Sequence, residues 1–494
     1  MKKISYYKLG IAVIIIAAVL RLAFALTHTV SGDACWHLSA ARFIAEENKM
    51  PLYEGIGRLQ PFWAPPLFHL IAAFLYKLFI PISVDFADLA MKLVSPVFGT
   101  FSVIILFLIA RDLFDEKIAF YSMLFVNFIP VFMDYSIFSF IESTVTFFSI
   151  LSVYFMLKNM YIISSVSLGL AMLSKYNAVF VLPMLLFLAY RLGKNKKEKM
   201  GRLALVAFLP LLVSSVWFIR NWILLKNPVW PFLNGIFNGV NIGTTFNTMD
   251  LGHLFSLSTY FEVYLELFGV PGGDLGTLSF AAIPGVNYLI FIWLIGTLIF
   301  IYPLIGGFFS VQTEGRATKD FFRGIYILLI SFLLMFVLYV VSLGWFNPRL
   351  LLPIIPFMAI IWALGLNSIK IQKVYLIAVI LVSFGFIGAQ AVKLSVASNE
   401  WGKYDADFQW VKDNTKEDSL FFGNGQCLSY NINRLVIDQK ADIDLKEADY
   451  VWVNNAWKID FTRSKKELDK IDDSNILEVA YNNENTGTVV YKVR

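Results

Sequence analysis

The sequence predicts a polytopic α-helical membrane protein with a small C-terminal α/β domain. Hydrophobic residues make up 58% of the chain and charged residues 16%, with a mean hydropathy of +0.66, whereas soluble domains are about 45–50% apolar. Apolar segments follow one another as far as residue 392, and the composition becomes soluble from about residue 395. The apolar surplus of the first part therefore has to face lipid.

Twelve apolar segments are candidates for membrane helices. Several are shorter than the roughly 20 residues that a perpendicular helix needs, so some are tilted, fused or incomplete, and we expect about 11–13 spans. The segments are 9–28, 67–80, 91–110, 118–133, 137–157, 160–174, 176–190, 203–225, 286–310, 324–343, 350–367 and 374–392.

Basic clusters between the segments predict the topology. Short loops rich in Lys and Arg stay in the cytoplasm, which applies to 191–202, 316–323 and 370–373. A first outer loop (30–66), a large outer loop (226–285) and the stretch 344–349 are then extracytoplasmic. Twelve full crossings would leave the C-terminus inside, whereas the last basic cluster predicts that it lies outside. We therefore expect 67–80 not to cross fully, in a multi-pass protein of the plasma membrane.

The soluble part is predicted to form a separate extracytoplasmic domain over 395–494, after a membrane domain over 1–394. Helical patterns near 404–414 and 464–470 alternate with short β-like runs at 434–438 and 450–453. This alternation is typical of a small α/β domain.

Charge and cysteine content exclude two classes of site. The net charge of +5 comes from short clusters between apolar runs, where topology explains it, so a nucleic-acid partner is not expected. Cys35 and Cys427 lie far apart and in different regions. They indicate neither a disulfide framework nor a cysteine-rich metal site.

The first outer loop carries the most informative group of polar residues. Asp33 stands at the start of a predicted helix over about 34–47, where a carboxylate often caps the helix. On that helix Asp33 and His37 are i and i+4 neighbours on one face. The pair could act as an acid and a base or hold a metal weakly, although two ligands at one spacing are poor evidence for a metal. The sequence thus leaves a divalent metal open and predicts no certain cofactor.

Further charged residues recur at the predicted outer ends of apolar segments. Glu142 lies between two such runs, and an ionisable residue at membrane depth is costly enough to indicate function. Lys175, Arg220 and Arg349 are isolated cations among aromatic residues at the same boundary. Three such cations suit the phosphate of a membrane lipid, and the alternative is that each long side chain snorkels to the interface.

These motifs together resemble the GT-C glycosyltransferases over about residues 9–367. The resemblance is greatest to the prokaryotic branch of the dolichyl-phosphate-mannose protein mannosyltransferases and to the aminoarabinose transferases of lipid A. The motifs, in chain order, are Gly-Asp-Ala…His37 with Pro65-Pro66, Gly-Leu-Ala-Met-Leu-Ser-Lys175-Tyr, Trp-Phe-Ile-Arg220-Asn-Trp with Lys-Asn-Pro-Val-Trp-Pro-Phe232, and Arg349-Leu-Leu-Leu-Pro-Ile-Ile-Pro356.

The resemblance implies a glycosyltransferase that takes a sugar from a polyprenyl phosphate and passes it, outside the membrane, to a hydroxyl of a protein, a lipid or a glycan. It also implies that Asp33 is catalytic, because the acidic residue of the family's first outer loop is. That loop often carries an Asp-Glu pair in the family, whereas this chain has Asp33-Ala34. Either no second acid is needed, or Glu142 or His37 takes its place.

The expected chemistry is a direct displacement at the anomeric carbon. Fixed cations stabilise the charge that grows on the departing phosphate, and Arg349 and Lys175, with Arg220, are the predicted phosphate-binding residues. Asp33 is the predicted base for the acceptor hydroxyl, and displacement inverts the anomeric configuration. The competing hypothesis is a polyprenyl-lipid flippase or transporter, and it predicts two similar halves and broken helices near the membrane midplane.

Overall fold

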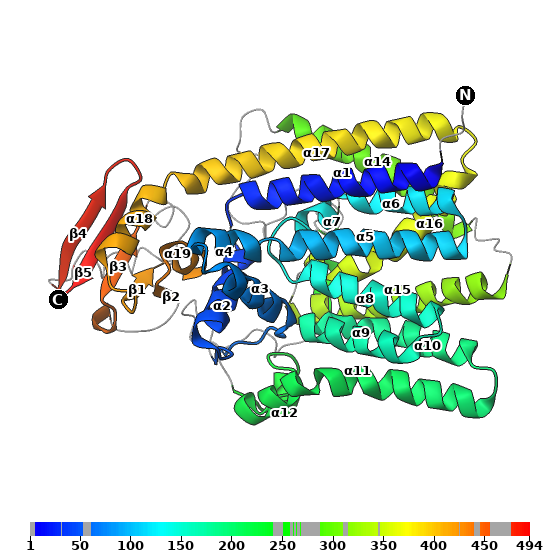
Figure 1. The fold of residues 1–494 in the computed structure, drawn as a ribbon, viewed down its shortest axis with the longest axis horizontal. Coiled ribbons are helices and arrows are strands. Elements are labelled where there is room, and N and C mark those ends of the chain that lie inside the picture. The colour runs from blue at the N-terminus through cyan, green and yellow to red at the C-terminus, as the bar shows by residue number, and fades with distance from the viewer. Residues whose placement is uncertain are drawn as a thin grey trace.

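The computed structural model describes residues 5–30, 32–52, 61–240, 250–256, 287–309, 315–343, 346–423, 425–438, 445–454 and 476–494, with the single residues 260, 263 and 267. Within these ranges the chain is an elongated bundle of helices, and a small sheet domain lies at one end of it (Figure 1). The predicted fold class is confirmed.

Most helices of the bundle run along its long axis, and α2, α3 and α4 gather at the end that faces the sheet domain (Figure 1). The elements are α1 (Tyr6–Thr27), α2 (Asp33–Glu47), α3 (Leu67–Phe79), α4 (Val84–Met91), α5 (Val94–Leu113), α6 (Glu116–Phe128), α7 (Pro130–Tyr135), α8 (Glu142–Leu157), α9 (Tyr161–Ser174), η1 (Tyr176–Val181), α10 (Leu182–Leu192), α11 (Lys196–Leu225), α12 (Asn234–Phe237), η3 (Leu251–Phe255), α14 (Asn287–Phe309), α15 (Arg316–Leu343), η5 (Pro348–Ile354), α16 (Ile355–Ser368) and α17 (Gln372–Gly402).

Five helical segments of the described chain are long and apolar enough to cross a membrane: Tyr6–Thr27, Val84–Leu113, Lys196–Leu225, Arg316–Ser342 and Pro348–Ser368. Shorter apolar helices pack between them. Large apolar side chains such as Phe208 and Val216 on α11 are 70% and 75% exposed, which suits a lipid-facing surface. Helix α3 has only 13 residues, or about 20 Å of helix, against a hydrocarbon core of about 30 Å. Its length agrees with the prediction that 67–80 does not cross fully.

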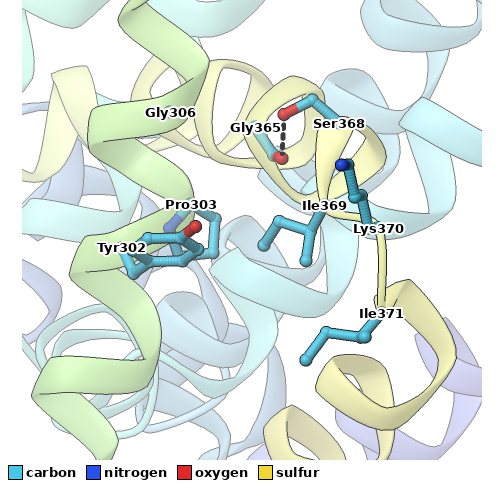
Figure 2. Close-up of a pocket in the computed structure, with 8 residues that line it drawn as sticks. All are labelled: Tyr302, Pro303, Gly306, Gly365, Ser368, Ile369, Lys370 and Ile371. Carbon is cyan, nitrogen blue, oxygen red and sulfur yellow. Dashed lines mark hydrogen bonds between the residues drawn. The ribbon is translucent and has the colours of Figure 1, made fainter.

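The far end of the bundle gathers basic residues. The buried carboxylate of Asp320 accepts from Arg191 Nε at 2.9 Å, and Arg316 and Arg323 lie within 4 Å of it. Two of the predicted basic clusters therefore meet at one end. A cavity of about 390 Å³ lies where α14 and α16 meet the turn into α17 (Figure 2). It is lined by Tyr302, Pro303, Gly306, Gly365, Ser368, Ile369, Lys370 and Ile371.

The sheet domain follows α17, which runs without a break from the bundle (Figure 1). The predicted boundary at residue 395 thus falls inside a helix, because the composition changes where the helix leaves the apolar bundle. The elements are α18 (Asp405–Asn414), β1 (Leu420–Gly423), α19 (Gly425–Ile432), β2 (Leu435–Asp438), η6 (Leu445–Glu447), β3 (Tyr450–Val453), β4 (Leu477–Asn483) and β5 (Thr488–Val493).

The sheet has the order β2-β1-β3-β5-β4. Strand β1 is parallel to β2 and β3, and β5 is antiparallel to β3 and β4. The predicted helix near 404–414 and the strands at 434–438 and 450–453 are confirmed. The helix predicted near 464–470 lies outside the described residues.

Candidate active site

Four residues that the sequence singled out lie together where the bundle meets α2. Arg349 Nη1 donates to Asp33 Oδ2 at 2.8 Å, and Arg349 Nε lies 3.5 Å from Glu142 Oε1. Lys175 Nζ donates to the same Glu142 oxygen. The cluster thus contains two carboxylates and two cations, and we call Asp33, Glu142, Lys175 and Arg349 the charge cluster.

Each member of the cluster stands at the end of a helix. Asp33 and Glu142 are the first residues of α2 and α8, where the partial positive charge of the helix favours a carboxylate. Gly32 precedes Asp33 with φ of 59°, a left-handed conformation that glycine adopts without strain. Lys175 follows α9, and Arg349 lies in η5. Apolar helices thus deliver their polar ends to one place.

The segment that carries Arg349 is fixed by amide side chains. Asn347 Oδ1 accepts from the Arg349 backbone N–H at 3.0 Å, and Asn177 Nδ2 donates to the Leu350 carbonyl at 3.0 Å. The first contact caps η5, and the second ties it to η1 beside Lys175. The two cations are therefore held by neighbouring backbone segments.

The four members of the charge cluster differ in how deeply their side chains are buried. The side chain of Glu142 is 1% exposed, that of Lys175 12%, that of Arg349 20% and that of Asp33 41%. A buried carboxylate is tolerated when it is paired with cations, as Glu142 is. Asp33 is the most exposed member, whereas Glu142 contacts Lys175 and Arg349 from the buried side.

His37 lies in the protein interior on α2. Its Nδ1 is 3.0 Å from His69 Nε2 of α3, and both rings are buried. Burial lowers the pKa of His37 to about 3; nearby Arg349 and Lys175 act in the same direction and Asp33 opposes them. The imidazole is therefore neutral at physiological pH and is placed against His69, which the sequence analysis did not single out.

Arg220 donates hydrogen bonds to backbone carbonyls of the first outer loop. Its Nη2 donates to the Pro51 carbonyl at 2.8 Å and its Nη1 to the Phe62 carbonyl at 3.1 Å, and the guanidinium lies 4.6 Å from the Trp217 ring. These contacts tie α11 to the aromatic residues around Trp36. They occupy the guanidinium with backbone oxygens, so its predicted role at a phosphate has less support than those of Arg349 and Lys175.

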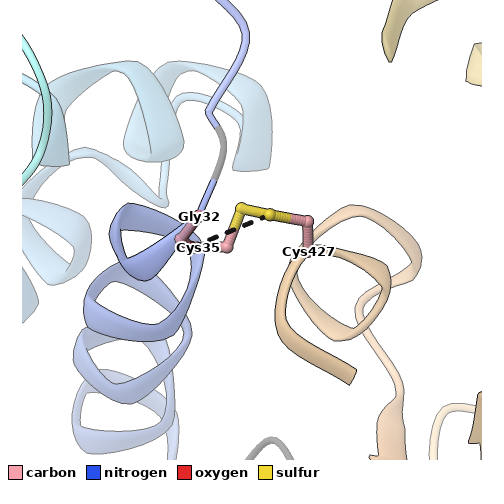
Figure 3. The surroundings of a disulfide bond; sticks show 3 residues. All are labelled: Gly32, Cys35 and Cys427. Carbon is pink, nitrogen blue, oxygen red and sulfur yellow. Dashed lines mark hydrogen bonds between the residues drawn. A yellow bond between two sulfur atoms is a disulfide. The ribbon is translucent and has the colours of Figure 1, made fainter. Parts of the chain in front are cut away.

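The prediction that the cysteines form no disulfide is wrong. Cys35 of α2 and Cys427 of α19 are bonded, with their Cα atoms 5.1 Å apart (Figure 3). A separation of 392 residues concealed that the sheet domain packs on α2. The available signal was that both cysteines lie in segments predicted to be extracytoplasmic, where disulfides persist.

The large outer loop adds little to the site within the described residues. Asp250 caps η3 through Gly252 N, and His253 Nε2 lies 3.8 Å from Asp250 Oδ2. Glu262 and Glu266, two further acidic residues of this loop, lie outside the described residues. In the part of the chain that is described, no three His, Cys, Asp or Glu residues are grouped as a metal site would require.

Comparisons with known proteins identify the class to which this architecture corresponds. Residues 64–218 match the family model described as dolichyl-phosphate-mannose-protein mannosyltransferase. In the comparison with curated proteins, no sequence matches.

Solved structures share the fold over nearly the whole chain. ArnT from Cupriavidus metallidurans, determined with undecaprenyl phosphate, matches with a TM-score of 0.64 and 13% identity over 98% of this chain and 97% of its own. The archaeal oligosaccharyltransferase AglB from Archaeoglobus fulgidus matches with a TM-score of 0.51 and 13% identity over 88% of this chain and 65% of its own. Arabinofuranosyltransferase AftD from Mycobacteria matches with a TM-score of 0.52 and 13% identity over 97% of this chain and 40% of its own.

These matches confirm the predicted resemblance. The chain is a membrane protein with the fold of the GT-C glycosyltransferases. Within that class it is similar to the dolichyl-phosphate-mannose-protein mannosyltransferases over 64–218 and to ArnT over its length.

Proposed function

We propose that the protein is a glycosyltransferase that moves a sugar from a polyprenyl phosphate to a hydroxyl of a protein, a lipid or a glycan at the extracytoplasmic face of the plasma membrane. The observation that carries the proposal is the pairing of Asp33 with Arg349 in a charge cluster built from helix ends. The similar structures support the donor class, since ArnT was solved with undecaprenyl phosphate and AglB with a dolichol-phosphate and a peptide.

Arg349 and Lys175 hold the phosphate of the donor. A guanidinium has five N–H donors, and Arg349 directs Nη1 at Asp33 and Nε at Glu142. Its remaining donors suit two phosphate oxygens, and the ammonium of Lys175 adds a second positive charge. Cations fixed before the reaction stabilise the charge that grows on the departing phosphate.

Asp33 accepts the proton of the acceptor hydroxyl. The anomeric carbon's bond to the phosphate oxygen breaks while its bond to the acceptor oxygen forms, and the configuration inverts. A carboxylate held by an arginine accepts a proton less readily than a free one. The donor phosphate, by taking up Arg349, therefore releases Asp33 for its task as base. Glu142 keeps both cations in place from the buried side.

Two features support an extracytoplasmic site. The Cys35–Cys427 disulfide lies next to the charge cluster, and disulfides persist in oxidising compartments. The N-terminal ends of α11 and α15, at Lys196 and Arg316, lie at the opposite end of the bundle (Figure 1), as the preference of basic loops for the cytoplasm requires.

The test is the release of polyprenyl phosphate from a radiolabelled polyprenyl-phosphate sugar in membranes that contain the protein. Asp33→Asn should abolish release, whereas Asp85→Asn, at the exposed start of α4, should leave it unchanged. Equal release from wild type and Asp33→Asn would exclude Asp33 as the base. Movement of intact donor across the membrane without loss of sugar would identify a flippase instead. The same assay with EDTA tests for a divalent metal.

A further inference from the structure

The sheet domain is joined covalently to the helix that carries Asp33. Cys35 stands two residues after Asp33 in the first turn of α2, and its partner Cys427 lies in α19 (Figure 3). Cys427 Sγ is also 3.8 Å from the carbonyl oxygen of Gly32, the residue that precedes Asp33. The sheet domain therefore contacts residues on both sides of the proposed base, the backbone of Gly32 and the side chain of Cys35.

Arg42 makes a second junction further along α2. Its Nη1 donates to Asn433 Oδ1 at 2.7 Å and to the Tyr430 carbonyl at 3.2 Å, and its guanidinium lies 5.0 Å from the Tyr430 ring. Its Nη2 pairs with Asp88 Oδ2 of α4 at 2.6 Å. One buried cation thus joins α2, α4 and the sheet domain.

Two junctions on one helix restrain it more than either does alone. The disulfide fixes Cys35 in the first turn of α2 against α19, and Arg42, seven residues later, is fixed against α4 and α19. The helix can then neither slide along its axis nor rotate about it without breaking a buried ion pair, which is costly. The partner of Asp33 comes from η5, so the Asp33–Arg349 contact depends on where α2 is held.

We propose that the sheet domain is a positioning element of the active site, and that Cys35, Cys427 and Arg42 are positioning residues that keep Asp33 in register with Arg349. The inference deepens the proposed function and rests on it. The sheet domain acts through α2, because Arg349 and Lys175 are held by other elements. Loss of the junctions should therefore lower kcat and leave the donor KM little changed.

Reduction of the disulfide tests the same idea in protein that is already folded. A dithiol such as dithiothreitol passes two electrons and two protons to the disulfide, which gives two thiols and the oxidised cyclic reagent. The Arg42 junction survives this step, so reduction should lower kcat in part. In Arg42→Lys, reduction should remove the remaining restraint.

The variants are Cys35→Ser/Cys427→Ser, Arg42→Lys and the triple substitution, with Arg434→Lys as the matched control. Arg434, like Arg42, is a buried arginine. It lies in the sheet domain, however, and donates to Lys412 O, Thr415 O and Thr415 Oγ1 of the same domain. We expect kcat to fall about tenfold for each junction lost and about a hundredfold for the triple variant, since small displacements of a catalytic group have effects of this size. The control should keep kcat within twofold.

Hydrogen exchange of α2 gives a readout that does not depend on activity. Exchange over residues 33–42 should rise in the junction variants and in reduced wild type, and it should stay at the wild-type level in Arg434→Lys. If the wild type transfers no sugar, the proposed function fails, and exchange alone then decides whether the sheet domain restrains α2. Unchanged kcat in a folded triple variant, or unchanged exchange of α2, overturns the inference.

Discussion

Arg349→Lys keeps the positive charge of the cluster and removes the geometry that lets one side chain serve two carboxylates. Arg349 reaches Asp33 through Nη1 and Glu142 through Nε, whereas a lysine has a single nitrogen on a flexible stem. The ammonium cannot hold both contacts and also present two donors to a phosphate. Removal of one preorganised donor at a developing anion lowers kcat by about 10²–10³, or roughly 2.7–4 kcal/mol, and we expect a loss in that range.

The assay is release of polyprenyl phosphate at saturating donor, measured together with the donor KM. Arg191→Lys is the control, because Arg191 also donates through Nε to a buried carboxylate, that of Asp320 at 2.9 Å, at the far end of the bundle. It should change kcat less than threefold. If Arg349→Lys retains kcat within threefold of wild type, the paired contacts of the guanidinium are irrelevant to transfer and the assignment of Arg349 to the phosphate is refuted.

Three further outcomes are expected. Glu142→Gln removes the buried charge that holds Lys175 and Arg349, so thermal unfolding in detergent should show a free energy of unfolding lower by about 3–5 kcal/mol. Adding Lys175→Met should recover stability without activity. An unchanged melting temperature of Glu142→Gln would count against the pairing. Burial holds the pKa of His37 at about 3, below the 6.5 of an unfolded histidine, so the unfolded state binds the proton first and stability falls between pH 6.5 and about 3. The loss from His37 is about 1 kcal/mol at pH 5.5. His37→Gln should therefore reduce the slope of the melting temperature against pH, while the buried neighbour His69 keeps part of it; an unchanged slope would contradict the role of His37. Asp407→Ala removes the buried carboxylate that accepts hydrogen bonds from four donors: Tyr481, Asn483, Thr486 and Thr488. The free energy of unfolding should fall by at least about 3 kcal/mol. Proteolysis of the sheet domain should become faster, and it should stay at the wild-type rate in the exposed control Asp413→Ala.

The sequence made the fold class and part of the cluster predictable for one physical reason. A charge at the end of an apolar segment is costly unless something compensates for it, so Glu142, Lys175 and Arg349 stood out against their surroundings. Asp33 was singled out by its place in the first outer loop and by the family resemblance. The helix of the first outer loop was also predictable, since a glycine and an acidic residue precede an amphipathic run. The predicted start at 34 and the observed start at Asp33 differ by one residue.

The partners of these charges could not be predicted. Asp33 and Arg349 are 316 residues apart in sequence, and no local pattern encodes which helix ends meet. The same holds for His37, whose partner His69 lies on α3, and for the cysteine pair between α2 and α19. Each contact follows from the packing of apolar helices, which is set by many weak interactions that no single motif records.

The pairing of the proposed base with the proposed phosphate-binding arginine is consistent with transfer once the charges are followed. The cluster holds two carboxylates and two cations, and a donor phosphodiester brings one negative charge. During transfer the acceptor proton goes to Asp33, so the carboxylate loses its charge in the same step in which the phosphate gains a second one. Arg349, which the bound phosphate has already taken from Asp33, neutralises the charge of the departing phosphate. The total charge of the site stays constant, which matters where the local dielectric is low. Deprotonation of the acceptor and departure of the lipid phosphate are therefore coupled, because Asp33 loses its negative charge as the phosphate gains one.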